Sequence, residues 1–598
     1  MTRTDPARSS VRLPSPAPER GHPFLGTLVK IGLARTRHTQ KAGPAATPGK
    51  IAFIYCASPR FTKFARLRHL GFNDFNRTKM ARPAAIPVID LFAGPGGLCE
   101  GFSSLIDPSG AKRFSVKVSI EKDKIAHQTL ALRALFRFFP KGKAPDSYYD
   151  YVRGKIKREE FLHLPEIKAA AAQAEKEAKC EELGVTPSET VDAWIRDGLG
   201  SSKDWVLIGG PPCQAYSMAG RSRMRKKDPV AFDNDHRHFL YTEYLRIIKD
   251  FEPAVFVMEN VKGVLSSKQG GTGIFARILS DLKAPKEGLI YQIRSLVVKG
   301  NELEPKDYVV RAEDYGIPQC RHRVILFGIR SDVAAKTTDI DKNPSKYLLR
   351  RVTPQVTVTQ ALSGLPPLRS RLSSGVDSDE VWLKAVNEAP QGLVNWKSPL
   401  RATIEASMER YMDQAKQHQS SGALFMPMAI TFGQNCPKPL KRWYSDPKVG
   451  GALQHQARSH MRTDLRRYLF AACYAKSEGV APTLRDFPPA LLPDHVNAKD
   501  DVIPFADRFR VQLAGKPSST VVSHIAKDGH YYIHHDPSQC RSLTVREAAR
   551  LQTFPDNYFF EGTRTEQYWQ VGNAVPPLLA RKIAQVIYNF MEAARAAR

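Results

Sequence analysis

The residues best suited to covalent chemistry lie in the segment 209–217, whose sequence is GGPPCQAYS. The preceding residues 205–208 are apolar and partly β-branched, so they predict a buried strand that ends at the two glycines. Glycines and prolines then hold Cys213 in a tight loop at the carboxyl end of this strand, where open α/β sheets place their reactive groups. Cys213 could therefore act as a nucleophile, although many cysteines are simply small apolar residues of a core.

Other predicted strands end in residues that suit a nucleotide site. Residues 87–92 lead into the glycine turn 93–97, residues 116–120 end at Glu121, and a further apolar run ends at Glu259. A glycine turn after a strand lets a nucleotide approach the backbone, and an acid after the next strand commonly accepts the ribose hydroxyls. We therefore expect one sheet edge to carry a nucleoside-containing cofactor, a thiol and a carboxyl group.

Taken in order, these segments resemble the motifs of the cytosine-5 DNA methyltransferases from about residue 84 onward. The matching segments are DLFAGPGG (90–97), SIEKD (119–123), GGPPCQ (209–214), MENV (258–261), YGIPQCRHRVILFG (315–328), RSLTVREAARLQTFPDNY (541–558) and VGNAVPP (571–577). The resemblance implies an α/β fold, the Rossmann-like and mostly parallel sheet of S-adenosylmethionine-dependent methyltransferases, with a smaller target-recognition domain. It also implies methyl transfer from S-adenosyl-L-methionine to carbon 5 of a flipped-out cytosine in a specific duplex DNA sequence.

The residues that the resemblance marks as catalytic are Cys213, Glu259, Arg321 and Arg323. Carbon 5 of cytosine is a poor nucleophile, and addition of a thiolate at carbon 6 turns the ring into an enamine that can take the methyl group. A cationic neighbourhood would keep Cys213 as a thiolate, and we expect Arg321 and Arg323, two apart on one strand, to share a face. Glu259 is the candidate acid at N3 of the ring. The base that removes the carbon 5 proton is not identified, and a bound water would serve.

The cofactor-binding residues that the resemblance implies come from separate segments of the chain. They are Phe92, Ala93, Gly94, Gly96, Gly97 and Leu98 of the glycine turn, Glu121 after the next strand, and Asn573 and Val575 of the last motif. The acid that contacts the adenine amino group has no clear motif here. Asp197 is our candidate and Asp192 is its rival. No metal is expected to take part.

A strong positive charge favours a polyanionic partner. The chain carries a formal net charge of +29, of which the first 79 residues contribute +12 from 15 Lys and Arg against 3 Asp and Glu. The remaining +17 belongs to the body of the chain, which favours binding of duplex DNA through counterion release. No side chain can reach carbon 6 of a stacked base, so the target must be flipped into a pocket. We expect a monomer to act on DNA.

Cysteine spacing and hydropathy limit the cellular setting. Eight cysteines are scattered singly and none forms a CxxC pair, which disfavours zinc ribbons and a secreted disulfide framework. The sequence has no apolar run near the roughly 18 residues of a membrane span, and no signal-peptide core at its start. We expect no membrane partner, and a reducing setting in the bacterial cytoplasm at the nucleoid. A cognate restriction endonuclease acting separately is one expected partner, and a solitary methylase is the alternative.

The motifs divide the chain into four parts. Residues 1–83 are predicted to be a disordered basic tail, which is a DNA-tethering arm, a transit peptide, or a segment that is not translated because Met80 is a natural start. Residues 84–335 are predicted to form the catalytic domain, with a helical insertion at 141–200. Residues 336–565 hold the target-recognition domain with a closing motif, and residues 566–598 return to the catalytic domain.

Several local elements are predicted within these parts. Residues 164–183 are rich in helix formers with alternating Lys and Glu, which indicates a solvated helix. Residues 457–468 read as a basic helix face or a DNA-lining segment, and residues 505–511 and 520–524 as strands. A helix capped by Thr544 should run to residue 552, with Arg546 and Glu547 organising a domain junction, and an apolar helix should span residues 578–593.

Three alternatives compete with DNA methylation. An RNA cytosine-5 methyltransferase would share the fold, although the long recognition segment favours DNA. A non-catalytic DNA-binding regulator would be expected to lack Cys213, Glu259 or the arginines, all of which are present. A nicotinamide oxidoreductase would rest on the glycine turn alone and would leave the cysteine loop unexplained.

Overall fold

The computed structural model describes residues 84–212, 240–269, 272–300, 302–337, 340, 342–494 and 505–597. The predictions for the tail 1–83 and for Cys213 fall outside these residues. The described chain reaches Pro212, so the entry to the Cys213 loop is defined even though the cysteine is not.

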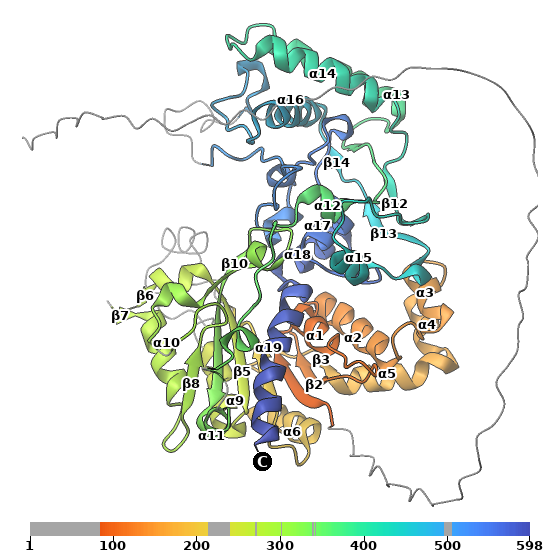
Figure 1. Cartoon of the computed structure of the whole chain (residues 1–598). Helices are drawn as coiled ribbons and strands as arrows, with labels where there is room; N and C mark the ends of the chain where they lie inside the picture. Colours follow the sequence, from red (N-terminus) through yellow and green to blue (C-terminus); the bar gives the residue numbers. More distant parts are fainter. Residues whose placement is uncertain are drawn as a thin grey trace, which may run out of the picture. The chain divides into compact units, whose positions relative to one another are not determined.

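A mixed sheet of eight strands forms the centre of the catalytic domain, in the order β3-β2-β1-β4-β5-β10-β8, with β9 also paired to β10 (Figure 1). From β3 to β5 the strands are parallel, and β10 runs antiparallel to β5, β8 and β9. The strands are β1 (Ile86–Leu91), β2 (Phe114–Ile120), β3 (Ala178–Lys179), β4 (Val206–Gly209), β5 (Val255–Val261), β8 (Tyr291–Arg294), β9 (Val309–Arg311) and β10 (His322–Arg330). The predicted α/β fold with a mostly parallel sheet is confirmed.

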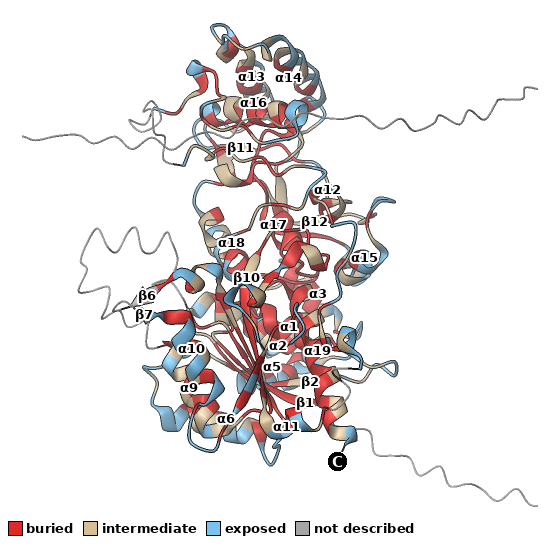
Figure 2. Cartoon of the chain, turned by 60° about the vertical axis from the view of Figure 1, so that its left-hand side comes forward, coloured by how far each residue is buried: buried red, intermediate tan, exposed pale blue. Residues whose placement is uncertain are grey.

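Helices cover both faces of this sheet. Alternate residues of β1 point to opposite faces, so Val88 packs in one core and Ile89 in the other. On the face of Val88 lie α1 (Gly97–Ser103), α2 (Lys124–Phe138), α11 (Ser331–Ala335) and α19 (Pro577–Ala596). On the face of Ile89 lie α6 (Ser188–Leu199), α9 (Leu240–Phe251) and α10 (Ile274–Lys283). Burial on both faces explains why these strands are mostly apolar, and the red colour of the sheet in Figure 2 shows that most of their residues are buried.

The C-terminal helix α19 packs directly on α1, which follows the glycine turn. A methyl group placed on Gly101 would lie 2.3 Å from the Cβ of Ala580, so only glycine allows the two helices to approach this closely. The sequence predicted that the last helix returns to the catalytic domain, and α19 lies on α1 and continues to Ala596.

The insertion differs from the single solvated helix predicted for residues 164–183. It contains α3 (Asp146–Val152), α4 (Arg158–His163) and α5 (Pro165–Glu177). The last of these ends earlier than predicted because residues 178–179 join the sheet as β3. It is also only partly solvated, since Ile167 and Ala170 are buried in a core shared with α2.

The recognition segment has an apolar core of its own. Its helices α13 (Asp379–Asn387), α14 (Arg401–Ala415) and α16 (Arg462–Glu478) contribute Trp382, Met408 and Leu469 to this core. We call this part the recognition lobe. The hairpin β12 (Gly422–Pro427) and β13 (Gly451–Gln456) lies outside that core, and the pair β11 (Arg371–Leu372) and β14 (Ser459–His460) connects the two (Figure 1). The other helices of this part of the chain are α12 (Val358–Leu362), α15 (Lys438–Tyr444) and α18 (Arg564–Asn573).

The predicted strands at residues 505–511 and 520–524 are wrong. Val511 makes only an isolated bridge to Ile533, and residues 523–526 form a short 3-10 helix, η11 (Ser523–Ala526). Side chains replace a neighbouring strand here, because Gln319 accepts from the Val521 N–H at 2.8 Å and Arg321 donates to its carbonyl at 2.9 Å. Because side chains already satisfy the Val521 N–H and carbonyl groups, these groups do not pair with a neighbouring strand.

The segment 457–468 is chiefly structural. Arg458 is buried and donates to the carbonyl of Ile525 at 2.6 Å, and α16 begins at Arg462. Arg467 lies 3.1 Å from Asp464 of the same helix, and Tyr468 is fully buried. These contacts favour the reading as a helix face over that as a DNA-lining segment for most of its positions.

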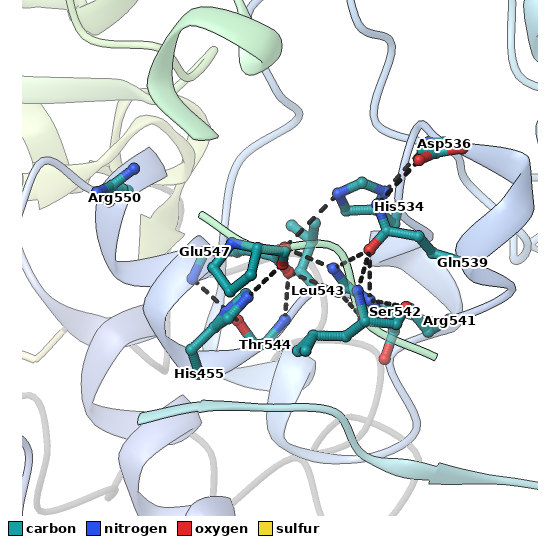
Figure 3. A network of polar contacts seen from close by, with 12 residues as sticks. His455, His534, Asp536, Gln539, Arg541, Ser542, Leu543, Thr544, Glu547 and Arg550 are labelled. Carbon is teal, nitrogen blue, oxygen red and sulfur yellow. Dashed lines mark hydrogen bonds and ion pairs between the residues drawn. The ribbon is translucent and has the colours of Figure 1, made fainter. Parts of the chain in front are cut away.

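A buried polar network, which we call the junction network, joins the recognition segment to helix α17 (Val545–Leu551) (Figure 3). Thr544 caps this helix in a capping box with Glu547, as predicted. Glu547 accepts from both terminal nitrogens of Arg541 at 2.7 Å. Arg546 donates to the carbonyl of Leu453 in β13 at 2.8 Å, so the expected role of Arg546 and Glu547 in organising this junction is confirmed.

Candidate active site

Three parallel strands bring the predicted site segments to one edge of the sheet. Gly209, the last residue of β4, pairs with Leu91 on one side and with Met258 on the other. The glycine loop that follows β1 and the carboxyl group of Glu259 in β5 therefore flank the chain that leads through Pro212 to Cys213. Topology places the entry of the nucleophile loop between the other two predicted groups.

The glycine loop has a backbone that only glycine readily adopts. Gly94 and Gly96 have φ angles of 57° and 95°, and Phe92 itself is left-handed at 58°. The N–H of Gly94 donates to Glu121 Oε2 at 2.8 Å, which joins the loop to the end of β2. A methyl group on Gly94 would meet no atom of the described residues within 4 Å, so among these residues this side of the loop is open to a ligand.

Glu121 is held by backbone donors beside this open loop. Its Oε1 accepts from the N–H of Asp123 at 2.8 Å, while Oε2 takes the bond from Gly94. Burial raises the pKa of Glu121, and the two N–H donors oppose that shift. A carboxylate fixed at this point suits the ribose hydroxyls of S-adenosylmethionine, as the resemblance predicts.

The rest of the glycine turn is held from behind by the two closing motifs. A methyl group on Gly97 would lie 2.2 Å from the carbonyl oxygen of Val575, and the Tyr558 hydroxyl donates to the carbonyl of Pro95. Ala93 and Leu98 are buried against the same core as α19. Asn573 is exposed at the end of α18. Val575 is thus beside the turn as predicted, whereas the role of Tyr558 was missed because no local pattern links it to Pro95.

A buried carboxyl group that sequence reasoning missed lies directly under this loop. Asp90 is fully buried at the end of β1, and the Cys99 thiol donates to its Oδ2 at 2.8 Å. Its Oδ1 accepts no hydrogen bond from the described residues. Burial raises the pKa of Asp90 to about 7, and the bond from Cys99 opposes that shift.

Glu259 and Arg323 form an ion pair at the other side of the nucleophile loop. Arg323 Nε lies 2.9 Å from Glu259 Oε1, but its N–H does not point at that oxygen, which accepts no hydrogen bond from the described residues. A methyl group on Gly210 would lie 3.1 Å from Glu259 Oε2. Gly210 therefore lets the loop approach the carboxyl group, a role that the sequence hinted at only through the doubled glycine.

Arg321 and Arg323 have different partners, which corrects the expectation that they act alike on one face. Arg321 precedes β10 and is buried, and its Nη1 donates to the carbonyls of Val521 at 2.9 Å and Gly572 at 3.4 Å. Burial and the charge of Arg323 lower the pKa of Arg321 to about 9, which leaves it protonated at neutral pH. Arg321 thus holds the closing segments to the site, and Arg323 pairs with Glu259.

The structure does not bring Asp197 or Asp192 to the cofactor loop. Asp197 is exposed on the last turn of α6, and Asp192 pairs with Arg246 of α9 at 2.8 Å. No hydrogen bond among the described residues joins either acid to the glycine turn. The end of β3 lies at this edge instead, where the N–H of Glu181 donates to the Glu121 carbonyl at 3.2 Å. In the sequence, Glu181 closely follows the residues that form β3, whereas both aspartates lie within a helix.

The described residues show no group of three or more His, Cys, Asp or Glu that could hold a metal ion, and none of their helices is long and apolar enough to cross a membrane. The expectation that no metal takes part stays a prediction.

The sheet order, the glycine turn and the acid after β2 define the fold of a S-adenosylmethionine-dependent methyltransferase. Residues 201–589 match the family described as C-5 cytosine-specific DNA methylase. Together with the relatives below, this match shows that the chain belongs to that family and is a S-adenosylmethionine-dependent DNA (cytosine-5-)-methyltransferase.

The relatives include named bacterial and archaeal enzymes. The Type II methyltransferase M.Bpa9945I of Bacillus paralicheniformis is 32% identical over 84% of this chain and 98% of its own length. The Type II methyltransferase M.AgeI of Thalassovita gelatinovora is 27% identical over 83% of this chain and 98% of its own. The DNA (cytosine-5-)-methyltransferase M.ApeKI of Aeropyrum pernix is 27% identical over 66% of this chain and 83% of its own.

This assignment decides among the alternatives that the sequence left open. A nicotinamide oxidoreductase is excluded, and membership of a DNA methylase family favours DNA over RNA as the substrate. The chain is an enzyme of this family and not a non-catalytic regulator.

Proposed function

We propose that this chain flips a target cytosine out of duplex DNA and methylates its carbon 5 through a covalent adduct with Cys213. The observation that carries the proposal is the position of β4 between β1 and β5, with its loop entering between the glycine turn and Glu259. A thiol loop at this position supports attack on a base held beside both the methyl donor and an acid.

The side chains of the site supply the proton and charge steps. The Cys213 thiolate forms a bond to carbon 6, and Glu259 gives a proton to N3 as the ring gains electrons. The position of the Glu259 carboxyl group supports this role, because its Oε2 atom lies at the entry of the Cys213 loop, 3.1 Å from where a methyl group on Gly210 would lie. Carbon 5 takes the methyl group, and a base then removes the carbon 5 proton. The Cys213–carbon 6 bond breaks to release the thiolate, and the proton on N3 returns to Glu259.

The residues at the glycine turn fit the methyl donor. S-adenosyl-L-methionine supplies the methyl group when it is bound. The open side of Gly94 and the Glu121 carboxylate support binding of its nucleoside part, with Phe92, Ala93, Gly96, Gly97, Leu98, Asn573 and Val575 around it. We propose Glu181 in place of Asp197 or Asp192 for the adenine amino group, since the end of β3 lies next to Glu121.

Residues 336–565 are proposed to carry target recognition. The separate core of the recognition lobe supports this assignment, because DNA would lie between two bodies that each hold their own shape. Since the body of the chain has a net charge of +17, electrostatic attraction supports binding of the phosphate backbone. The base contacts that set the target sequence are not assigned.

The biological setting follows from the names of the relatives. Two of the relatives above are named Type II methyltransferases, which supports a role in restriction-modification with a separate endonuclease, or as a solitary methylase. We expect a monomer acting in the bacterial cytoplasm at the nucleoid.

The test is a duplex that carries 5-fluorocytosine in place of cytosine. Fluorine at carbon 5 blocks the final elimination, so the enzyme and methyl donor should give an adduct that survives denaturing gels and maps to Cys213. The matched control replaces Cys320, a half-buried thiol outside the nucleophile loop, by serine and should leave adduct formation unchanged. An active enzyme that forms no adduct, or one that maps elsewhere, would contradict the covalent mechanism.

A further inference from the structure

The hairpin β12–β13 connects the recognition lobe to the catalytic domain. Leu453 of β13 and Val449 before it are buried in one core with Tyr148 of α3, whereas the lobe core contains no residue of the hairpin. Residues 457–460 lead from β13 through β14 into α16 of the lobe. Figure 1 shows α3 beside this hairpin. The hairpin therefore links the core that contains α3 to the chain that enters the lobe.

Asp446 accepts hydrogen bonds from several of the segments that meet at this attachment. Its Oδ2 accepts from the Tyr149 hydroxyl of α3 at 2.9 Å and from Asn557 Nδ2 at 2.8 Å. Its Oδ1 accepts from the N–H of Lys448 at 3.1 Å and so caps the short 3-10 helix η8 (Pro447–Val449). One carboxylate thus joins the recognition segment to the insertion and to a closing motif at once.

Further contacts around Asp446 fix the same segment to α3. Arg153 Nε donates to the carbonyl of Val449 at 3.0 Å. Lys448 Nζ donates to the carbonyl of Ala144 at 2.9 Å and lies 2.9 Å from Asp146 Oδ1. These contacts align η8 with one end of the insertion, so the insertion contributes to placement of the lobe.

The Asn557 side of this contact leads to the cofactor site. Arg133 donates to Asn557 Oδ1 at 3.1 Å and to Glu100 Oε1 of α1 at 2.7 Å. The next residue, Tyr558, donates to the carbonyl of Pro95 in the glycine turn. The segment that anchors Asp446 is thus the segment that holds the cofactor loop.

We propose that Asp446 is a positioning residue that aligns the recognition lobe with the active site. The proposal rests on the proposed recognition role of residues 336–565. A carboxylate is required because its two oxygens serve donors from three segments, and an asparagine at this position would have one acceptor oxygen only. Since the lobe has a separate core, loss of the carboxylate changes the alignment of the lobe and not its folding.

The experiment compares Asp446→Asn with Asp250→Asn in the full chain. Asp250 is the matched control because it lies on α9 of the catalytic domain, outside the recognition lobe, with its side chain 47% exposed, and it pairs within its own helix with Arg246. For each variant, kcat and KM are measured with duplex DNA containing the methylated sequence, as mapped by bisulfite sequencing. The dissociation constant of S-adenosylmethionine is measured without DNA.

For Asp446→Asn we expect KM for DNA to rise by about tenfold, the order of effect of a lost hydrogen bond to a charged group. Both kcat and the cofactor dissociation constant should stay within about twofold, and Asp250→Asn should match the parent enzyme. Tyr149→Phe removes one donor and should raise KM in the same direction. The double variant should then be no worse than Asp446→Asn, because both changes break one contact.

The proposal is overturned if Asp446→Asn behaves as Asp250→Asn does, or if kcat or cofactor affinity falls while KM is unchanged. Should Asp446→Asn fail to fold, Tyr149→Phe decides by the same criteria. The fluorocytosine adduct of the parent enzyme does not depend on Asp446. An adduct together with an unaffected Asp446→Asn therefore contradicts only the positioning role.

Discussion

In two buried polar regions of this chain, the junction network and the active edge of the sheet, the charged groups differ in how completely they are hydrogen-bonded. In the junction network, Arg541 and Arg550 place every guanidinium nitrogen in a hydrogen bond, and they pair with Glu547 and Asp556. At the active edge, Glu259 Oε1, Arg321 Nε and Asp90 Oδ1 make no hydrogen bond with the described residues.

The difference follows from what each region must do. A buried charge costs several kcal/mol unless it is fully paired, so a region that only holds the fold together must be complete on its own. A binding region instead keeps donors and acceptors for its ligand and is complete only when the ligand is present. We therefore expect changes at the junction to lower stability and changes at the active edge to lower turnover.

The largest effect is expected at the active edge from Cys213→Ser. Loss of the thiolate removes the covalent route, so turnover should fall by at least about 10⁴-fold, while cofactor binding and the unfolding midpoint stay near those of the parent. Tritium transfer from labelled cofactor measures the first quantity and calorimetry the second. Substantial residual transfer would show that the site does not depend on this thiol.

At the junction, Arg541→Ala should have the largest effect on stability. It leaves Glu547 charged and buried without its partner, so the free energy of unfolding should fall by about 3–5 kcal/mol. Urea unfolding followed by circular dichroism measures the loss. Arg401→Ala, at a half-exposed pair on α14, is the control and should cost less than about 1 kcal/mol. If Arg541→Ala and Arg401→Ala lowered the free energy of unfolding equally, the junction network would not differ in stability from an exposed ion pair.

Acid should weaken the junction in a defined range of pH. Burial lowers the pKa of His455 from 6.5 to about 4, and His455 bonds to Thr544 of the network at 2.9 Å (Figure 3). Between these values the unfolded chain binds a proton that the folded chain does not, so stability falls as the pH drops from 6.5 toward 4.

At pH 5 the contribution of His455 should be lower by about 2 kcal/mol than at pH 7. Urea unfolding at several pH values gives the free energy of unfolding as a function of pH. Between pH 4 and 6.5, the slope of this curve in the His455→Gln variant should be smaller by the equivalent of about one bound proton. An unchanged slope would show that this imidazole is already protonated in the folded chain.

The smallest effect is expected from removal of residues 1–79. Every motif lies at or after Asp90, so a chain that starts at Met80 should keep full activity and the same target sequence. Loss of its +12 charge should flatten the salt dependence of DNA binding equally for all sequences, because phosphate contacts do not read bases. A truncated chain that fails to fold, or that methylates another sequence, would contradict this.

Local rules in the sequence were sufficient for much of the active edge. The glycine turn, Glu121, Glu259 and the Thr544 cap are each set by residues within a few positions, so strand ends and turn chemistry predict them. The packing of α19 on the catalytic domain could also be predicted, because the preceding segment 571–577 resembles a family motif whose place in the fold is known.

Contacts between distant segments could not be read in this way. The partner of Arg321 is a carbonyl about two hundred positions away, and Asp446 meets Tyr149 and Asn557 across separations of 297 and 111 positions. Asp197 lies within α6 and not after a strand, and the two-residue strand β3 is too short to leave a signal in the sequence. Polar partners of this kind depend on the assembled fold and leave no period or spacing in the sequence.

The central claim is tested most directly by the same substitution at both regions, Glu259→Gln and Glu547→Gln. We predict that Glu259→Gln lowers kcat by about 10²–10⁴-fold with DNA affinity nearly unchanged, and that its unfolding free energy stays within about 1 kcal/mol of the parent. Glu547→Gln should instead lose about 3–5 kcal/mol of stability, since Arg541 keeps its buried charge without a carboxylate, and should keep its kcat at temperatures where it is folded. The opposite pattern, or equal losses of stability and turnover in both variants, would contradict the division between an active edge that awaits its ligands and a junction that is complete without them.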